Sequence, residues 1–235
     1  MNKAENLENN LRSVNTLEWL NAEFRSLTPE QRLARITRAF PAERILITSS
    51  FGADSALFLD ALARATPLRR IHFIDTGFHF AETLAYQAEL AARWQLEIVR
   101  IVPDAKLHQY SADNELWRRD PDLCCSVNKV QPLDEISAPF TLWITGLMSW
   151  QTAHRQSLPL FEQAGALLKF HPLLDLTALD AAARRHEHAL PIHPLAAAGY
   201  ASIGCSHCTR PGNARAGRWS GKSKSECGLH TKAKI

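Results

Sequence analysis

The sequence lacks the features of several common protein classes. None of its 235 residues belong to an apolar run near the ~20 residues that a helix needs to cross a bilayer. Residues 1–13 contain no apolar core of a secretion signal. The net charge of +3 is too small to argue for a nucleic-acid-binding protein. We therefore expect a cytoplasmic protein that binds neither membranes nor nucleic acid.

Two nucleotide-binding fingerprints are also missing. The chain contains no GxGxxG motif of a dinucleotide-binding turn and no G-K-[S/T] of a Walker loop. Its composition, 46% hydrophobic and 22% charged, is that of an ordinary soluble domain. A nucleotide site, if there is one, must use other loops.

Helical and strand patterns alternate along the first 150 residues. Helical patterns cover residues 28–40, 55–65 and 80–94, and short apolar, β-branched runs cover 44–48, 71–75, 96–101 and 141–146. Strands separated by helices predict parallel β-α-β units. We therefore expect an α/β fold whose parallel sheet has helices on both faces.

Polar, glycine-bearing segments follow two of the predicted strands. They are TSSFGADS (48–55) and DTGFHFAET (75–83). Ligands of open parallel sheets bind beyond the carboxyl ends of the strands, and a helix start suits an anion. The alternative is a pair of plain turns, with Asp75 capping the next helix. Both interpretations stay open on these residues alone.

The end of the chain is basic. From Cys205 onward, a single acid, Glu226, stands among seven cations. These are Arg210, Arg215, Arg218, Lys222, Lys224, Lys232 and Lys234. Such a segment is either a solvated, flexible end or a mobile arm that closes over an anionic ligand.

The five cysteines form two pairs and one single residue. The pairs are Cys124-Cys125 and Cys205-x-x-Cys208, and the single residue is Cys227. Adjacent cysteines fit one zinc ion poorly, but they can bind two corners of a [4Fe–4S] cubane. The ~80 residues between the pairs fit a compact zinc ribbon poorly. Incidental buried cysteines and a redox-active CxxC are the alternatives.

Several motifs together resemble one family. They are SSFGADS, DTGFHFAET, CCSVNKVQPL, GYASIGCSHCTRPG, RAGRW and ECGLHT, spread over about residues 45–230. The chain is similar to the phosphosulfate-reductase family, and within it to the assimilatory adenylyl-sulfate reductases. The resemblance implies an adenine-nucleotide α-hydrolase-like fold. It also implies reduction of adenosine 5′-phosphosulfate to sulfite and AMP with electrons from thioredoxin or a glutaredoxin-like donor.

The resemblance assigns the five cysteines two roles. Cys124, Cys125, Cys205 and Cys208 would hold a [4Fe–4S] cluster. The thiolate of Cys227 would attack the substrate sulfur, release AMP and form an S-sulfocysteine. Nearby cations would lower the thiol pKa and neutralise the two anions as they meet.

The resemblance also implies substrate-binding residues. The adenosine and α-phosphate would lie among Ser49, Phe51, Gly52, Ser55, Asp75, Thr76, Gly77 and Gly146. The phosphosulfate would lie among Lys129, Arg155, Arg215, Arg218 and His230. Three segments result: an N-terminal helical segment (1–40), a nucleotide-binding α/β domain with the iron–sulfur site (41–210) and a flexible catalytic tail (211–235). A homo-oligomer is possible.

The chain departs from the family pattern near the expected site. After Gly146 the family has Leu-Arg-Arg-acid-Gln, whereas this chain has Leu147-Met148-Ser149-Trp150-Gln151. Asn128 replaces an arginine before Lys129, and the link from Cys208 to Arg215 is short. The choice between adenylyl sulfate and its 3′-phosphorylated form therefore stays open.

Two other functions stay open. One is an ATP-using enzyme of the same fold, such as a tRNA-thiolating enzyme, but the SSFGADS loop lacks the second glycine of those enzymes. The other is a non-catalytic metal-binding module whose basic tail binds nucleic acid.

Overall fold

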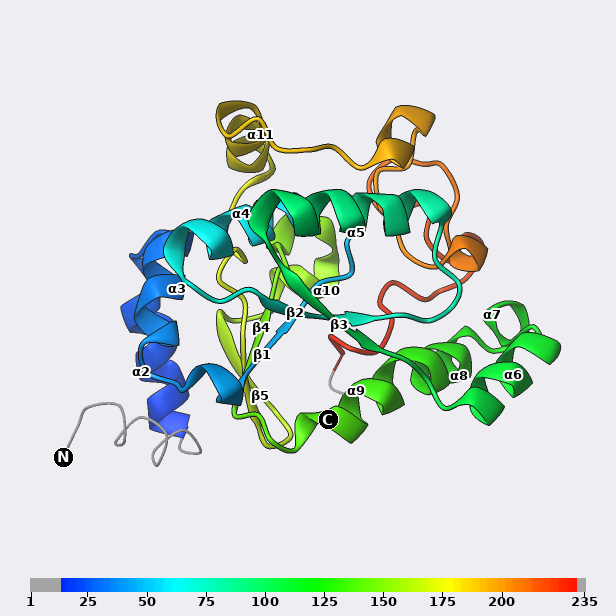
Figure 1. The fold of residues 1–235 in the computed structure, drawn as a ribbon, viewed down its shortest axis with the longest axis horizontal. Coiled ribbons are helices and arrows are strands. Elements are labelled where there is room, and N and C mark those ends of the chain that lie inside the picture. The colour runs from blue at the N-terminus through cyan, green and yellow to red at the C-terminus, as the bar shows by residue number, and fades with distance from the viewer. Residues whose placement is uncertain (1–13, 232–235) are drawn as a thin grey trace.

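Residues 14–231 are described by the structure, a computed structural model, and they contain one six-stranded sheet (Figure 1). The strand order is β3-β2-β1-β4-β6-β5. The strands are β1 (Ile45–Thr48), β2 (Arg70–Ile74), β3 (Glu97–Ile101), β4 (Leu142–Thr145), β5 (Phe161–Ala164) and β6 (Leu167–Phe170). All neighbours pair in parallel except the edge strand β5, which is antiparallel to β6. The predicted α/β fold is confirmed, and the four predicted strands lie within one residue of their expected bounds.

Ten α-helices connect and cover the strands in the described part of the chain. They are α2 (Val14–Arg25), α3 (Pro29–Thr37), α4 (Ser55–Ala65), α5 (Ala81–Trp94), α6 (Ala105–Asp113), α7 (Leu116–Arg119), α8 (Pro121–Cys125), α9 (Gln131–Ser137), α10 (Ala153–Gln156) and α11 (Ala178–Glu187). Helix α3 begins with the predicted capping box: Gln31 donates its N–H to Thr28 Oγ1, and Thr28 donates its N–H to Gln31 Oε1.

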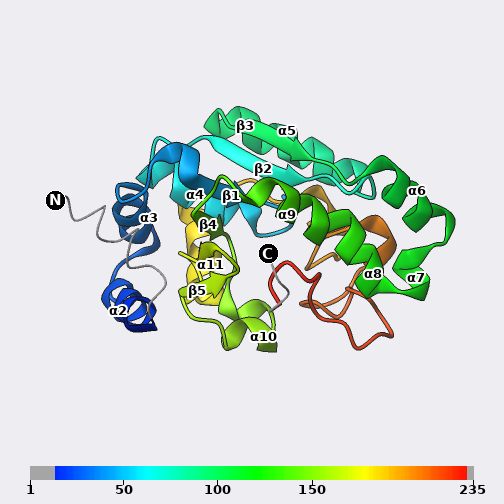
Figure 2. The ribbon, with the colours of Figure 1, turned by 90° about the horizontal axis from the view of Figure 1, so that it is seen from below.

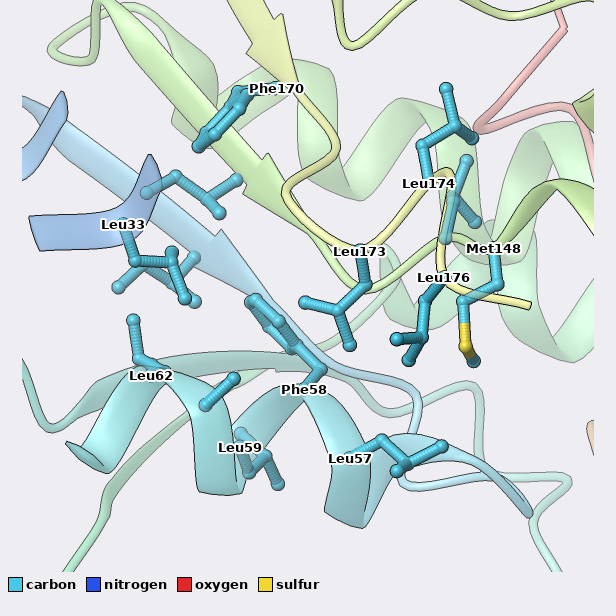
Figure 3. Close-up of a cluster of buried hydrophobic side chains, with 14 of the residues drawn as sticks. Leu33, Leu57, Phe58, Leu59, Leu62, Met148, Phe170, Leu173, Leu174 and Leu176 are labelled. Carbon is cyan, nitrogen blue, oxygen red and sulfur yellow. The ribbon is translucent and has the colours of Figure 1, made fainter. Parts of the chain in front are cut away.

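The alternation of side chains along β1 explains why helices cover both faces. Ile45 and Ile47 face the larger core, which includes side chains of α2 to α5 (Figure 3). Leu46 between them faces a smaller core that includes Leu133 of α9. Successive strand residues point to opposite faces, so a strand that is buried on both faces reads as a continuous apolar run.

The sequence patterns did not predict the β5–β6 hairpin or the short helices between residues 105 and 137. Strands β5 and β6 have four residues each, and Lys169 interrupts the apolar run of β6. Between 121 and 137, two short α-helices flank a π-helical turn, Ser126–Val130, so no long apolar period develops. Periodicity needs longer elements than these.

The position of β1 determines where a ligand can bind. From β1 the chain adds β2 and β3 on one side, and it then returns to place β4 on the other side of β1. This reversal is a topological switch point, where the loops after β1 and β4 diverge and leave a crevice. The loops Ser49–Ser55 and Gly146–Thr152 therefore face each other across the carboxyl end of the sheet.

The C-terminal segment returns to this end of the sheet. In Figures 1 and 2 the red segment lies between the sheet and helices α7 and α8. Leu229 packs against the smaller core, which anchors the segment to the sheet. The predicted flexibility of this tail stays a prediction. None of the helices in residues 14–231 is both long and apolar enough to cross a membrane.

Candidate active site

A pocket lies at the switch point, between the β1 and β4 loops and the C-terminal tail. Ten of the residues expected to bind substrate or react line it. They are Ser49, Gly52, Ser55, Lys129, Gly146, Arg155, Arg215, Arg218, Cys227 and His230. The structure therefore brings together residues that lie up to about 180 positions apart in the sequence.

Four of the expected substrate-binding residues do not line this pocket. Phe51 is fully buried and packs edge-on against Phe73, with ring centroids 5.5 Å apart. Asp75 forms an ion pair with Arg100. Thr76 Oγ1 lies 3.4 Å from Cys205 Sγ, and Gly77 packs beside His108. Residues 75–77 therefore lie outside the pocket, and Thr76 among them contacts a paired cysteine.

The four paired cysteines lie around a second, smaller cavity next to the pocket. Cys124, Cys125, Cys205 and Cys208 all line it, together with the aromatic rings of Phe78, Trp117, His207 and Trp219. Within residues 14–231, no three His, Cys, Asp or Glu side chains are close enough to hold a single metal ion. Four thiols spaced around a shared cavity suit a larger, polynuclear centre better.

Hydrogen-bond donors surround Cys124. Ser111 Oγ and Asn128 Nδ2 each lie 3.7 Å from Cys124 Sγ. Asn128 also donates to the Cys124 carbonyl oxygen, and its Oδ1 accepts from His108 Nδ1. The residue that replaces the family arginine is thus buried against a cysteine and does not line the substrate pocket.

Lys129 lines both cavities. Burial alone would lower the pKa of its ammonium group, but the neighbouring thiolates of Cys205, Cys227 and Cys125 raise that pKa above its ordinary value. Burial likewise would raise the pKa of Cys205, and the Lys129 charge and Thr76 hydroxyl outweigh it and lower that pKa. One buried cation is therefore shared between the paired cysteines and Cys227.

The short link between Cys208 and Arg215 forms a tight hairpin. Thr209 and Arg218 form an antiparallel bridge, and Trp219 donates its N–H to the Cys208 carbonyl oxygen over 3.0 Å. A side chain at Gly204 would overlap the Arg218 guanidinium, so glycine lets this arginine lie against the backbone before Cys205. The hairpin thus joins the CxxC turn to the arginine pair.

Glu226 holds the tail in the pocket. Its side chain is only 1% exposed, and it accepts from Arg155 Nε (2.7 Å) and Arg155 Nη2 (2.9 Å). Thr152 Oγ1 donates to the same carboxylate over 3.0 Å, and Arg215 lies 3.4 Å away. Burial would raise the pKa of Glu226, but Arg155 and Arg215 outweigh it and hold that pKa below its usual range.

A socket on the sheet receives the two residues after Gly228. Lys169 Nζ donates to the Leu229 carbonyl oxygen (3.2 Å), and His154 Nε2 donates to that of His230 (2.6 Å). The His230 ring stacks on Trp143 with centroids 5.9 Å apart. Together with Glu226, the socket fixes the backbone on both sides of Cys227.

Several buried polar atoms in this pocket have no hydrogen-bond partner within the described part of the protein. Seven side-chain atoms in residues 14–231 are of this kind, and five of them belong to pocket-lining residues. The five are His79 Nδ1, Arg215 Nε, Arg218 Nε, Trp219 Nε1 and His230 Nδ1. Buried polar groups are nearly always paired, so these atoms indicate a site built for a polar ligand.

The two pocket histidines are neutral at neutral pH. Burial, reinforced by the Lys129 charge, lowers the pKa of His79 to about 4. Burial, reinforced by Lys169 and Arg155, also lowers the pKa of His230 well below its usual value. The charged side chains of the lining are then four cations (Lys129, Arg155, Arg215, Arg218) and two carboxylates (Asp54, Glu226), a net charge of +2.

Sequence reasoning missed Glu226, Trp219 and Lys169 as parts of the site. Glu226 carried one signal, as the single acid in a basic tail beside the reactive cysteine. Lys169 carried none, because its burial under the tail depends on the unpredicted strand β6.

The fold is an α/β fold of the adenine-nucleotide α-hydrolase type, and the thiol of Cys227 lines the pocket at its switch point. The model of the phosphoadenosine phosphosulfate reductase domain matches residues 44–211. The chain belongs to the phosphoadenosine phosphosulfate reductase family and is an oxidoreductase.

Named relatives carry two substrate labels. The adenosine 5′-phosphosulfate reductase of Mesorhizobium japonicum is 40% identical over 90% of this chain and 85% of its own length. The phosphoadenosine 5′-phosphosulfate reductase of Gloeobacter violaceus is 38% identical over 92% of this chain and 93% of its own length. Similarity at this level assigns the family and leaves the choice between the two substrates open.

Solved structures agree on the fold. A phosphoadenylyl-sulfate reductase from Candida auris has a TM-score of 0.69 and 26% identity, over 84% of this chain and 98% of its own. An FMN adenylyltransferase from Candida glabrata has a TM-score of 0.52 and 16% identity, over 88% of this chain and 74% of its own, and it shares the fold alone.

Glu226→Gln will release the tail. The substitution leaves the buried Arg155 charge without its partner, a change that costs about 3–5 kcal/mol in buried pairs. We expect tryptic cleavage near Lys222 and Lys224 to become at least about tenfold faster. Glu43→Gln, at an exposed position, is the control and will leave the rate unchanged. Equal rates in all three proteins would show that Glu226 does not hold the tail.

The same anchor gives the tail a pH dependence. Because the folded-state pKa of Glu226 is lowered, its contribution is complete above about pH 4.5 and is lost as pH falls through the folded-state value. The rate at which an aromatic disulfide reagent labels Cys227, read by peptide mass spectrometry, will therefore differ between Glu226→Gln and wild type at pH 7. The ratio of the Cys227 labelling rate in Glu226→Gln to that in wild type will approach one in acid.

Proposed function

We propose that the protein reduces adenosine 5′-phosphosulfate to sulfite and AMP in sulfate assimilation, with Cys227 as the nucleophile. The thiolate attacks the substrate sulfur, the bond from sulfur to the bridging oxygen breaks, and AMP leaves with that electron pair. An S-sulfocysteine remains on Cys227. One thiol of a dithiol donor such as thioredoxin then attacks the Cys227 sulfur and expels sulfite, which leaves a mixed disulfide. The donor's second thiol attacks that disulfide, releases the Cys227 thiolate and leaves the donor as its disulfide.

One observation carries this proposal. Cys227 lines the same pocket as the unpartnered polar atoms Arg215 Nε, Arg218 Nε and His230 Nδ1, of which the two arginine atoms are donors. A thiolate and a phosphosulfate repel each other, so the reaction needs fixed positive charge where they meet. Lys129, Arg215 and Arg218 supply that charge, and guanidinium groups suit the oxygens of phosphate and sulfate.

Arg155 has a different part in this scheme. Its Nε and Nη2 donate to Glu226, and its Nη1 donates to Gln151. It is 7% exposed. In this arrangement Arg155 positions the catalytic tail, and the phosphosulfate binds to the other three cations.

The charge of the pocket favours adenylyl sulfate over its 3′-phosphorylated form. The phosphosulfate group has two negative charges, and the lining has a net charge of +2 with Cys227 as a thiol and +1 with Cys227 as the attacking thiolate. A 3′-phosphate would add about two more at pH 7. The β1 loop, which would face the ribose, contributes Asp54 to the lining and no cation from the residues described.

The paired cysteines support a [4Fe–4S] cluster. Cys124, Cys125, Cys205 and Cys208 would be its ligands, and four thiols around a cavity walled by Phe78, Trp117 and Trp219 fit such a group. When bound, the cluster would supply negative charge next to Lys129 and so tune the electrostatics around the sulfate. The chain's own part is to hold Lys129 between the cysteine ligands and Cys227.

The other functions have less support. A zinc-binding module would need its ligands to converge on one ion, and the described cysteines are spread around a cavity instead. A tail bound to nucleic acid would leave its basic face free, whereas Arg215 and Arg218 line the pocket and Lys224 pairs with Asp122. The β1 loop reads Ser50-Phe51-Gly52, so it has one glycine where ATP-cleaving relatives of the fold have two.

Cys227→Ser will abolish the reaction while sparing the site. We expect sulfite release from adenylyl sulfate and reduced thioredoxin to fall at least about a thousandfold, because the nucleophile is lost. AMP affinity will stay within about threefold of wild type, since substrate binding rests on other side chains. Mass spectrometry will find the sulfonated peptide of residues 225–235 only in proteins that retain Cys227. Ser220→Ala, an exposed neighbour, is the control. Sulfite from the serine variant, or an adduct elsewhere, would refute the nucleophile.

Adenylyl sulfate will be the better substrate by at least about tenfold in kcat/KM. Asp54→Asn removes one of the two lining carboxylates, so it will raise the relative use of the 3′-phosphorylated substrate. The Glu43→Gln control will leave the ratio unchanged. A wild-type preference for the 3′-phosphorylated substrate would contradict the charge argument, but it would leave the proposed type of reaction unchanged.

Protein purified without air will contain about four iron atoms per chain. Cys208→Ser will lose most of this iron and the visible absorption, because a cluster corner loses its thiolate. Cys227→Ser will keep both, since Cys227 is not a ligand in this scheme. Stoichiometric zinc in place of iron, or unchanged iron in Cys208→Ser, would exclude the cluster assignment.

A further inference from the structure

In the segment after β4, the sequence departs most from the family pattern. The three residues there lie in different environments. Met148 is fully buried and lies beside Leu174 and Leu176 in the larger core (Figure 3). Ser149 donates its N–H to the Leu174 carbonyl oxygen over 2.7 Å. Trp150 remains 37% exposed and lines the substrate pocket. Of the three altered positions, 148–150, Trp150 is the one that lines the pocket.

Trp150 is held in a defined place. It lies in a 3₁₀ turn, Ser149–Gln151, whose first residue is anchored to the core. Gln151 closes this turn: its Oε1 accepts from the Met148 N–H and from Arg155, and its Nε2 donates to Asp54 Oδ2 over 2.7 Å. The turn is thereby tied to the β1 loop on one side and to the anchor of the tail on the other.

Apolar side chains line the pocket together with Trp150. Phe58, Leu147 and Ala53 are among them. A Cβ at Gly146 would come within 2.8 Å of Phe58, so glycine there lets the loop after β4 pack closely against α4. Within residues 14–231, no aromatic ring or cation is in stacking contact with the Trp150 indole. An indole that is 37% exposed leaves apolar ring surface in contact with water, and this flat surface can pack against another flat ring.

We propose that Trp150 stacks on the adenine base of the nucleotide. This inference rests on the proposed function only in that the ligand is an adenine nucleotide. Arg215, Arg218 and Cys227 all belong to the C-terminal segment, so in this proposal the phosphosulfate binds beside that segment and the base extends toward the β1 and β4 loops. An aromatic side chain stacks on a base without reading its edge, so Trp150 contributes affinity for any purine.

The test compares two ligands that differ in the base. AMP and ribose 5-phosphate are titrated by calorimetry into wild type, Trp150→Ala and Trp150→Phe. We expect Trp150→Ala to weaken AMP binding about tenfold or more, the range of one base-stacking contact, and to leave ribose 5-phosphate within about twofold. Trp150→Phe will retain most of the AMP affinity, because the smaller ring still stacks. Trp19→Ala, an exposed tryptophan of α2 outside the pocket, is the control and will bind both ligands as wild type does.

The outcomes separate this inference from the proposed function. Unchanged AMP affinity in Trp150→Ala, or an equal loss for both ligands, would overturn stacking while AMP binding to wild type persists. If Trp150→Ala instead raised only the KM for reduced thioredoxin, Trp150 would be a contact for the protein donor and the inference would be wrong. Failure of wild type to bind AMP at all would refute the nucleotide site itself.

Discussion

The buried pair between Arg155 and Glu226 is the constraint on which the geometry of the pocket depends. Arg155 belongs to the short helix α10 after β4, and Glu226 precedes Cys227 in the tail, 71 residues later. Because the carboxylate is almost fully buried, the pair fixes the position of the tail backbone more tightly than an exposed ion pair could. The socket at Lys169, His154 and Trp143 adds a second point of attachment after Cys227. A thiol between two attachment points has a defined place over the pocket.

A second constraint is the sharing of one cation by two sets of sulfur atoms. Lys129 follows the cysteine pair in a π-helical turn and lines both cavities. Its pKa is raised by thiolates from both sides, so it remains charged although it is buried. The hairpin that joins Cys208 to Arg218 has a similar effect, because it fixes an arginine of the pocket relative to one of the paired cysteines. Any centre held by the four cysteines is therefore coupled to the substrate pocket through short, rigid connections.

The sequence predicted the features that arise from local patterns and missed those that arise from tertiary packing. The runs 44–48 and 141–146 are continuous and apolar, so the strands β1 and β4 and the crevice between their loops could be expected. Motif position placed Arg215, Arg218, Cys227 and His230 at one site, and all four line the pocket. Thr76 and Gly77 were expected there too, yet the turn after β2 directs them to Cys205 and His108. No pattern in a basic tail shows that its one carboxylate will be buried.

In the proposed reaction, a tail that is fixed in this way must still leave the pocket, because the donor has to reach Cys227 after the sulfur bond is formed. The chemistry of the anchor permits this. Removing two charges from water offsets most of the attraction between them, so a buried ion pair contributes far less net stability than its contacts suggest. The contacts of Glu226 therefore fix the position of the docked tail and contribute only a modest net free energy of docking. This combination suits a segment that closes and opens during each turnover of the proposed reaction. An apolar anchor of the same size would hold the tail by burial alone. When the ion-paired anchor opens, by contrast, Arg155 becomes a solvated charge that attracts Glu226 and so favours the return of the tail.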